Sequence, residues 1–215
     1  MSRIAGATPA VPIRVFYPRN LLMNRTELCT TTTPFTNYVV NLLGGPGAGK
    51  STNALLLTGK LKKAGYNAEY TGEYAKDCVW RKAENILEDQ IYIFGKQNNR
   101  QFRLKNQVQF TITDSPLILN LHYGNHLGPT FKKLALETFN SYNNINFFIE
   151  RTKVYNPVGR MQTAQESDTI ANEVIELLLK NQVPFTRINS DWDLDDLVDL
   201  VLKATKTTIN PLIVC

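Results

Sequence analysis

The 215-residue chain lacks the features that mark membrane and disulfide-bonded proteins. No run approaches the roughly 18 consecutive apolar residues of a membrane helix, so membrane association is not expected. The three cysteines, Cys29, Cys78 and Cys215, are far apart and odd in number. That pattern argues against a disulfide framework and for a reducing compartment. Together these absences predict a protein of the cytoplasm.

Metal-binding side chains are also scarce. The chain has two histidines and no Cys-x-x-Cys pair, so a structural zinc site is not predicted. His122 and His126 have the spacing i, i+4, but the segment between them lacks the glutamate of a zinc protease helix. We interpret both histidines as structural or surface residues.

The net charge of +5 is unevenly distributed. Residues 1–37 contain four arginines and one glutamate, and they account for three of the five positive charges. The remainder is only slightly basic, as expected of a protein that handles anionic phosphates. Binding to nucleic acid stays open, without support from the charge.

Residues 1–37 differ in composition from the rest. They contain four prolines and a run of threonines, and no hydrophobic periodicity persists. We predict a poorly ordered or loosely docked N-terminal extension, followed by one folded domain over residues 38–215. A segment rich in arginine and poor in acids is also typical of a mitochondrial transit peptide, but the prolines disfavour its amphipathic helix.

One strong motif follows the extension. Residues 44–51, GGPGAGKS, fit the pattern G-x-x-x-x-G-K-[ST] of a phosphate-binding loop. An apolar run over residues 38–43 precedes the loop, and helical spacing over residues 50–63 follows it. The motif requires this order of strand, loop and helix. A simple glycine turn before a helix is the alternative, and the flanking strand disfavours it.

The residue types in this loop suit a nucleoside triphosphate. Glycines allow backbone N–H groups to wrap a phosphate, and the start of the helix adds its positive end. Lys50 is predicted to reach the β- and γ-phosphates, and the Ser51 hydroxyl to bind Mg²⁺. We therefore predict ATP and Mg²⁺ as bound species. The predicted nucleotide-binding residues are Gly44, Gly45, Pro46, Gly47, Ala48, Gly49, Lys50, Ser51 and Thr52.

Strand and helix patterns alternate from residue 38 onward. Strands are predicted over residues 38–43, 67–71, 108–113, 145–149 and 184–188, and helices over residues 50–63, 75–88, 90–104, 131–139, 164–180 and 191–205. Such alternation is typical of a parallel sheet covered by helices on both faces. The predicted fold is therefore an α/β three-layer sandwich.

Two carboxylates follow predicted strands, at the edge where ligands bind in such folds. Asp114 follows the strand at 108–113 and is predicted to hold Mg²⁺ or to act as a base toward an acceptor hydroxyl. A helix N-cap before Pro116 is the alternative. Glu73 follows the strand at 67–71 and is predicted to accept the proton of a substrate hydroxyl. A solvated glutamate at a helix start explains Glu73 equally well.

Cations follow the strand predicted at residues 145–149. Arg151 and Arg160 belong to the segment ERTKVYNPVGRMQ, residues 150–162, which also contains proline and glycine. This composition predicts a mobile lid whose cations neutralise charge on a transferring phosphoryl group. A solvated basic loop is the alternative.

The helical stretch at residues 90–104 carries further polar candidates. Gln97 is predicted to contact an acceptor, because a glutamine can pair with the edge of a nucleobase. Arg100 lies in the same polar stretch and is predicted to take part. An ordinary solvent-facing helix surface is the alternative for both.

Four segments, in order, resemble one known family. GGPGAGKST, GEYAKD, ITDSPL and ERTKVYNPVGRMQ are similar to the motifs of the P-loop kinases typified by the ribosylnicotinamide kinase domain of NadR. Relatives include phage proteins described only as AAA-type ATPases. The resemblance covers about residues 38–205 and leaves the extension outside. It implies a parallel five-stranded sheet of the nucleoside and nucleotide kinase type, with ATP and Mg²⁺ as cosubstrates.

The resemblance also implies roles for individual residues. It places Asp114 and Glu73 near the acceptor, and Arg151 and Arg160 in the lid. Lys76 stands where relatives often have an arginine, and a lysine cannot make the same bidentate contact. The predicted catalytic residues are Lys50, Asp114, Glu73, Arg151 and Arg160; the acceptor-binding residues are Glu73, Lys76, Gln97 and Arg100; the metal ligands are Ser51 and Asp114.

Three functions stay open at this point. The favoured one is a kinase that moves the γ-phosphoryl group of ATP to a hydroxyl of a nucleoside or nucleoside-like small molecule. It would act in the cytoplasm, or in the host cytoplasm if a phage encodes it. The second is a kinase acting on DNA or RNA, at a 5′-hydroxyl end or a modified base. The third is an ATPase or switch that transfers nothing to an acceptor.

Overall fold

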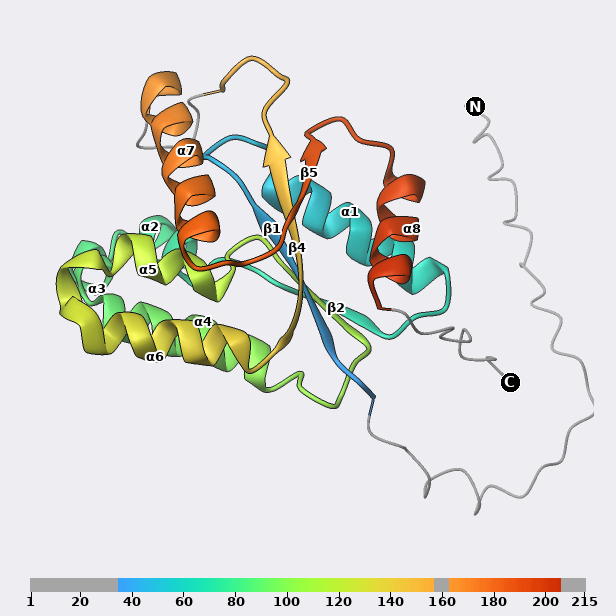
Figure 1. Cartoon of the computed structure of the whole chain (residues 1–215), viewed down its shortest axis with the longest axis horizontal. Coiled ribbons are helices and arrows are strands. Elements are labelled where there is room, and N and C mark those ends of the chain that lie inside the picture. Colours follow the sequence, from blue (N-terminus) through green and yellow to red (C-terminus); the bar gives the residue numbers. More distant parts are fainter. Residues whose placement is uncertain (1–34, 157–162, 206–215) are drawn as a thin grey trace, which may run out of the picture. The chain divides into compact units, whose positions relative to one another are not determined.

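The described part of the chain forms one open β-sheet with helices on both faces (Figure 1). The structure, a computed structural model, describes residues 35–156 and 163–205. Its five strands are parallel and follow the order β2-β3-β1-β4-β5. They are β1 (Tyr38–Leu43), β2 (Ala68–Thr71), β3 (Phe110–Thr113), β4 (Asn143–Glu150) and β5 (Thr186–Asn189). The predicted α/β sandwich with a parallel five-stranded sheet is confirmed.

Helices and short helical turns connect successive strands. Those before β3 are α1 (Lys50–Lys63), α2 (Tyr74–Trp80), α3 (Glu84–Glu88) and α4 (Gln90–Phe102). Those after β3 are η1 (Leu117–Leu119), α5 (Asn120–Tyr123), η2 (Asn125–Leu127), α6 (Gly128–Asn140), α7 (Ala164–Lys180) and α8 (Leu194–Ala204). Within the described ranges, no helix combines the length and the apolar character needed to cross a bilayer.

Two buried cores cover the two faces of the sheet, because alternate residues of a strand point to opposite faces. In β1, Val39 and Leu43 belong to the core shared with α4, α6 and α7. Val40 and Leu42 belong to the core under α1 and α8. Figure 1 shows α6 and α7 on one side of the sheet and α1 and α8 on the other. The central strand is therefore apolar on both faces, as a parallel strand covered by helices requires.

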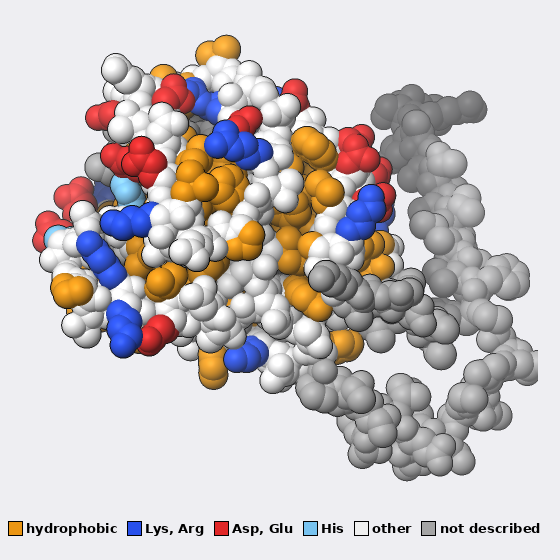
Figure 2. Space-filling model, viewed as in Figure 1, with side chains coloured by type: hydrophobic (Ala, Val, Ile, Leu, Met, Phe, Trp, Pro, Cys, Tyr) orange, Lys and Arg blue, Asp and Glu red, His pale blue; other side chains and the backbone are white. Residues whose placement is uncertain are grey.

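The far edge of the sheet is less well covered. β5 is an edge strand, and Ile188 is the buried residue among its four. The space-filling view shows hydrophobic side chains at the surface between α7 and α8, where β4 and β5 lie, with charged side chains around them (Figure 2). Polar residues on β5 thus limit the apolar surface that this edge exposes.

The strand order brings the loop after β1 to the middle of one sheet edge. β1 pairs with β3 on one side and with β4 on the other. The chain therefore leaves β1 at the point where the direction of the crossovers changes. In open parallel sheets, ligands bind outside the carboxyl ends of the strands at such a point. Residues 44–49 begin there, and the segments after β2, β3 and β4 begin at the same edge.

Most predicted elements are present, but three details differ. The single helix predicted over residues 75–88 is wrong: α2 and α3 are separate, because Lys82 adopts a left-handed backbone conformation with a φ of 54° between them. Residues 117–127, which have no clear periodicity, form the short turns η1, α5 and η2. Finally, several boundaries move by two or three residues: β3 and β5 begin two residues later than predicted and β4 two earlier, while α6 begins three residues earlier and α8 three later.

Candidate active site

The loop over residues 44–49 depends on glycine for its backbone shape. Gly44, Gly47 and Gly49 have φ angles of 142°, 81° and 88°, a region that other residues enter only with strain. Gly49 is the N-cap of α1, no side chain caps that helix, and its first turn carries no acidic residue. The start of α1 therefore presents uncapped N–H groups and the positive end of its dipole to a bound anion.

Two of the loop glycines are also required by close packing. A Cβ on Gly44 would lie 2.7 Å from the backbone oxygen of Ile149 at the end of β4. A Cβ on Gly45 would lie 2.5 Å from the backbone oxygen of Ser167 in α7. The Ser167 hydroxyl in turn donates a 2.6 Å hydrogen bond to the carbonyl of Pro46. The loop is thus held between the end of β4 and the first turns of α7.

Lys50 begins α1 and turns its side chain back over the loop. Its Nζ donates to the carbonyl oxygens of Gly44 and Gly45, each at 2.9 Å. A cation held at the mouth of the loop is well placed to exchange these carbonyls for phosphate oxygens. Ser51 and Thr52 follow in the first turn. All nine residues predicted to bind the nucleotide therefore lie in this loop and the first turn of α1, where their binding role stays a prediction.

Asp114 lies at the end of β3 and is almost fully buried, with 3% of its surface exposed. The Tyr70 hydroxyl on β2 hydrogen-bonds to this carboxyl group, and burial together with the Asp114 charge raises the pKa of that hydroxyl. The other carboxyl oxygen, Oδ1, has no hydrogen-bond partner within the described residues. The alternative of a helix N-cap is wrong, because η1 begins after Pro116 without any side-chain cap.

Glu73 lies between β2 and α2, directly before the first residue of that helix. Burial is the main cause that raises the pKa of Glu73 above its ordinary value. The charge of Lys50 opposes this shift and the charge of Asp114 adds to it, so the electrostatic fields of both groups reach the carboxylate. Partial burial and the Glu73 charge raise the pKa of Tyr123, at the end of α5, to about 12. The structure therefore brings Glu73, Lys50 and Asp114 into one electrostatic cluster.

The oxygen atoms at this edge suit a hard divalent cation. Asp114 offers a buried carboxylate oxygen that lacks a partner within the described residues, and Ser51 offers a hydroxyl at the start of α1. Within residues 35–156 and 163–205, no three His, Cys, Asp or Glu side chains cluster in a way that could hold a metal ion. Mg²⁺ at this position would therefore take most of its ligands from phosphate and water, as it usually does. The residues present fit that ion.

Of the two arginines predicted to form the lid after β4, the structure describes only Arg151. Arg151 forms an ion pair with Asp168 of α7, and its guanidinium lies 5.1 Å from the centre of the Tyr155 ring. Arg160 and the centre of the predicted lid lie outside the described residues. Arg151 is thus tied to the same helix that holds the phosphate loop, and its role in transfer stays a prediction.

The predicted acceptor residues gather around the turn that carries Glu73. Gln97 of α4 is 2% exposed; its Oε1 accepts from the Tyr74 N–H at 2.9 Å, and its Nε2 donates to the Gly72 carbonyl at 3.2 Å. Arg100 donates to the same carbonyl at 2.9 Å and forms an ion pair with Asp77. Both side chains therefore brace the turn, and their contact with an acceptor stays a prediction.

Lys76 occupies a different position from these two residues. It is exposed on α2, and its charge favours ionisation of Glu73. The charge of Lys76 therefore reaches the acidic cluster, and its contact with an acceptor stays a prediction.

Several polar residues at this edge carry no signal in the sequence motifs. Asn53 is buried in α1, where its amide donates to the Gly49 carbonyl at 3.1 Å and to the Ser190 carbonyl at 3.4 Å. The Ser190 and Thr152 hydroxyls lie 2.6 Å apart. These contacts join the phosphate loop to the segments after β4 and β5. Only the tertiary fold brings these residues together, because they are scattered over more than a hundred positions.

One family matches most of the chain. The AAA_28 family, described as an AAA domain, matches residues 39–193. This range runs from the second residue of β1 to the residue before α8, so it includes the phosphate loop, Glu73 and Asp114. A search of curated proteins found no significant match.

Solved structures of low sequence identity share the fold. A thymidylate kinase from Ehrlichia chaffeensis is 16% identical with a TM-score of 0.53, covering 80% of this chain and 99% of that one. A NadR protein in complex with NAD and AMP-PNP is 16% identical, and one in complex with NR is 17% identical, each with a TM-score of 0.59. Each of these two matches covers 82% of this chain and 52% of the NadR chain, so this chain spans about half the length of NadR.

Proposed function

Because the chain belongs to the AAA_28 family and has the fold of nucleoside and nucleotide kinases, we propose that it is a P-loop kinase. It transfers the γ-phosphoryl group of ATP to a hydroxyl of a nucleoside or nucleoside-like small molecule. The kinase domain spans residues 38–215, and residues 1–37 are an extension of it. The scattered cysteines and the use of ATP support action in the cytoplasm.

The loop and the first turn of α1 bind the triphosphate through backbone N–H groups. Lys50 leaves the loop carbonyls for the β- and γ-phosphates when ATP enters. Ser51 and Asp114 are the residues that would hold Mg²⁺, which when bound neutralises phosphate charge. Arg151, together with Arg160, neutralises charge that spreads over the transferring group.

The observation that carries this proposal is the position of Glu73. A carboxylate used only for solubility would be solvated, with an ordinary pKa. Glu73 instead has a pKa raised by burial and lies within the fields of Lys50 and Asp114. A raised pKa makes a carboxylate a better proton acceptor at neutral pH. An ATPase that uses only water could work without an acceptor base at the end of β2, whereas a kinase benefits from one.

The proposed transfer balances as follows. Glu73 takes the proton of the acceptor hydroxyl, and the hydroxyl oxygen forms a bond to the γ-phosphorus. The bond between that phosphorus and the β–γ bridging oxygen breaks, and ADP leaves with that oxygen. Lys50 stabilises the charge on the phosphates during the exchange. The products are ADP, the phosphorylated acceptor and a proton that Glu73 returns to water.

The test is transfer of label from γ-labelled ATP in the presence of Mg²⁺. The acceptor panel holds nicotinamide riboside, ribonucleosides and deoxyribonucleosides, their monophosphates, 5′-hydroxyl oligonucleotides and DNA with a hydroxymethylated base. Lys50→Ala removes a phosphate contact, and we expect transfer to fall by about a hundredfold or more. Lys63→Ala, which removes an exposed cation at the other end of α1, is the matched control and should leave transfer unchanged.

The outcomes separate the three functions. Label on a small acceptor supports the proposal and names the substrate. Label only on oligonucleotides or on modified DNA would replace it with a kinase acting on nucleic acid. Label released only as free phosphate, whatever the acceptor, would replace it with an ATPase or switch.

A further inference from the structure

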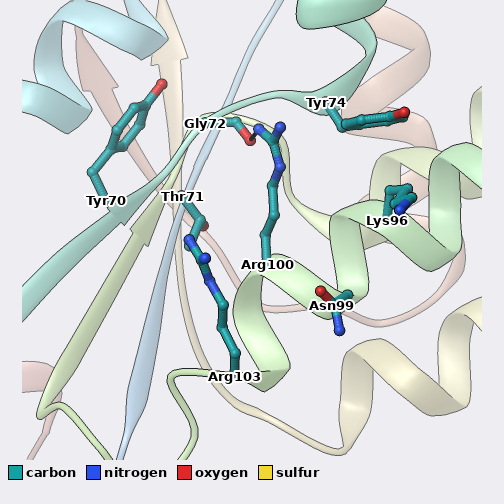
Figure 3. A pocket seen from close by; sticks show the side chains of 8 residues that line it. All are labelled: Tyr70, Thr71, Gly72, Tyr74, Lys96, Asn99, Arg100 and Arg103. Atoms are coloured by element: carbon teal, nitrogen blue, oxygen red, sulfur yellow. Dashed lines mark hydrogen bonds between the residues drawn. The ribbon is translucent and has the colours of Figure 1, made fainter.

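A pocket of about 340 Å³ lies between the end of β2 and helix α4. Its lining residues come from the end of β2, from Gly72 and the first residue of α2, and from the C-terminal part of α4 with the residue that follows it (Figure 3). They are Tyr70, Thr71, Gly72, Tyr74, Lys96, Asn99, Arg100 and Arg103. A volume of this size is at the lower end for small-molecule sites, enough for a phosphate and part of a sugar or a base.

The pocket carries an excess of positive charge. Lys96, Arg100 and Arg103 are spaced by four and three residues, so they share one face at the end of α4. Arg100 forms an ion pair with Asp77. Across residues 35–156 and 163–205, Lys96 and Arg103 have no carboxylate partner within ion-pair distance. Like charges at this spacing destabilise a helix, so a bound anion would relieve the repulsion among them.

The cations are directed toward the end of β2. Figure 3 shows Arg100 and Arg103 rising from α4 toward Gly72 and Thr71. Arg100 is fixed there by its hydrogen bond to the Gly72 carbonyl and by the face of the Tyr74 ring, 5.2 Å away. Planar guanidinium groups in a fixed position match the geometry of phosphate oxygens.

The pocket adjoins the turn that carries Glu73. Gly72 lines the pocket, and the next residue is Glu73. Tyr70 also lines the pocket, and its hydroxyl hydrogen-bonds to Asp114. A molecule seated against α4 would therefore lie beside the turn that carries the proposed base.

We propose that this pocket binds an anionic group, a phosphate, on the acceptor. The acceptor is then a nucleotide whose sugar hydroxyl reaches Glu73, rather than an uncharged nucleoside. This inference rests on the proposed kinase function and narrows its substrate class. Arg100 and Arg103 hold the phosphate, and Lys96 adds positive charge at the rim of the pocket.

The test compares binding of nucleosides with binding of their 5′-monophosphates by calorimetry, using all four bases and the full chain without ATP. We expect at least one monophosphate to bind about tenfold or more tightly than its nucleoside, because charge-assisted hydrogen bonds to phosphate are strong. Arg103→Ala should remove most of that difference while leaving the affinity for ATP unchanged. Lys63→Ala loses the same charge outside the pocket and should leave the difference intact.

Arg103 caps α4 only through its backbone, so Arg103→Ala is expected to fold, and thermal unfolding checks this. Arg103→Lys is the second variant: it keeps the charge but loses the bidentate geometry, so it should recover part of the preference for the monophosphate. If Arg103→Lys keeps the full preference for the monophosphate, the result still supports an anion site. If neither variant changes that preference, the anion site is overturned.

Other binding results separate the proposed phosphate site from the proposed kinase function. Equal affinities for nucleosides and their monophosphates would overturn the proposed phosphate site, and so would equal losses of affinity for both in Arg103→Ala. Labelled transfer to a nucleoside would still support the proposed kinase function. A clear preference for monophosphates without transfer to any acceptor upholds the anion site and overturns the kinase. Binding of a 5′-phosphorylated tetranucleotide but of no mononucleotide overturns the pocket as proposed and assigns it to a nucleic acid strand.

Discussion

Glycine has two separate roles in the phosphate loop, and the sequence motif reveals only one. Gly47 and Gly49 supply left-handed backbone conformations. Gly45 has no such conformation but lies against the backbone of α7. The pattern G-x-x-x-x-G-K-[ST] requires glycine only at Gly44 and Gly49, so it gives no reason for the glycine at position 45 and does not say which neighbour excludes a side chain there. That neighbour is Ser167, more than a hundred residues away.

The packing role predicts that an alanine substitution lowers the free energy of unfolding at one glycine and raises it at another. Gly45→Ala places its Cβ 2.5 Å from the Ser167 backbone oxygen, and we expect a loss of about 1–3 kcal/mol in the free energy of unfolding. Gly59→Ala lies in α1 with nothing within 4 Å of its Cβ and should raise that free energy by about 0.5–1 kcal/mol. Denaturant unfolding measures both. Equal effects at the two sites would contradict the packing role.

The raised pKa of Glu73 has opposite consequences for stability and for activity. Burial favours the protonated form in the folded state. The contribution of Glu73 to stability is therefore fully present below its ordinary pKa and is lost as the pH rises through the raised value. Glu73→Gln is neutral at every pH, so its melting temperature should exceed that of the wild type at neutral pH and approach it in acid.

Activity follows the other protonation state. The proposed base must be ionised, so wild-type transfer should rise with pH through the raised pKa. Glu73→Gln should lose transfer by about a hundredfold or more and lose this pH dependence, while calorimetry finds ATP binding intact. A variant that transfers phosphate at the wild-type rate would remove Glu73 from the mechanism.

At the scale of elements, local signals decided how well the sequence predicted the structure. α7 begins and ends as predicted, and Thr163 with Glu166 forms a capping box at its start. Between α2 and α3 the sequence offers no glycine or proline, so the left-handed Lys82 had no signal. The turns at residues 117–127 are too short for periodicity to show. Their position depends on packing against α6, which no local pattern encodes.

The contact between α7 and the phosphate loop can be tested directly. Ser167→Ala removes the 2.6 Å hydrogen bond to the Pro46 carbonyl and should cost about 1 kcal/mol in the free energy of unfolding. It should also raise the KM for ATP, because the loop loses a support. Thr169→Ala removes an exposed hydroxyl bond within α7 and is the control. An unchanged KM in Ser167→Ala would show that the loop holds its shape without α7.

At the scale of the whole molecule, the two cores draw their buried residues from positions 39–201. The fold class was predictable because the apolar strands and the loop motif agree with one architecture. The candidate site was predictable only as residue types: Lys50, Glu73 and Asp114 follow from their places after strands. Tyr70, Asn53 and Ser190 required the tertiary fold, since their partners come from distant parts of the chain.

The composition of residues 1–37, with four prolines and no lasting hydrophobic periodicity, predicts that the N-terminal extension contributes little to folding. Removing residues 1–33 should change the melting temperature by less than about 2 °C, and labelled transfer to a small acceptor should continue at the full rate. Differential scanning calorimetry and the labelled-ATP assay measure the two quantities. Loss of transfer with an unchanged melting temperature would instead assign the extension a part in catalysis.

The central position of β1 also affects how the chain folds during its synthesis. This strand is synthesised first, yet its pairing strands are β3 and β4, which end about 70 and 105 residues later. At roughly 5–20 residues per second, the second edge of β1 waits about 5–20 s for its partner during translation. During that interval an apolar strand and a loop of glycines lie without their partners. We therefore expect the nascent chain to be most prone to aggregation before β4 leaves the ribosome.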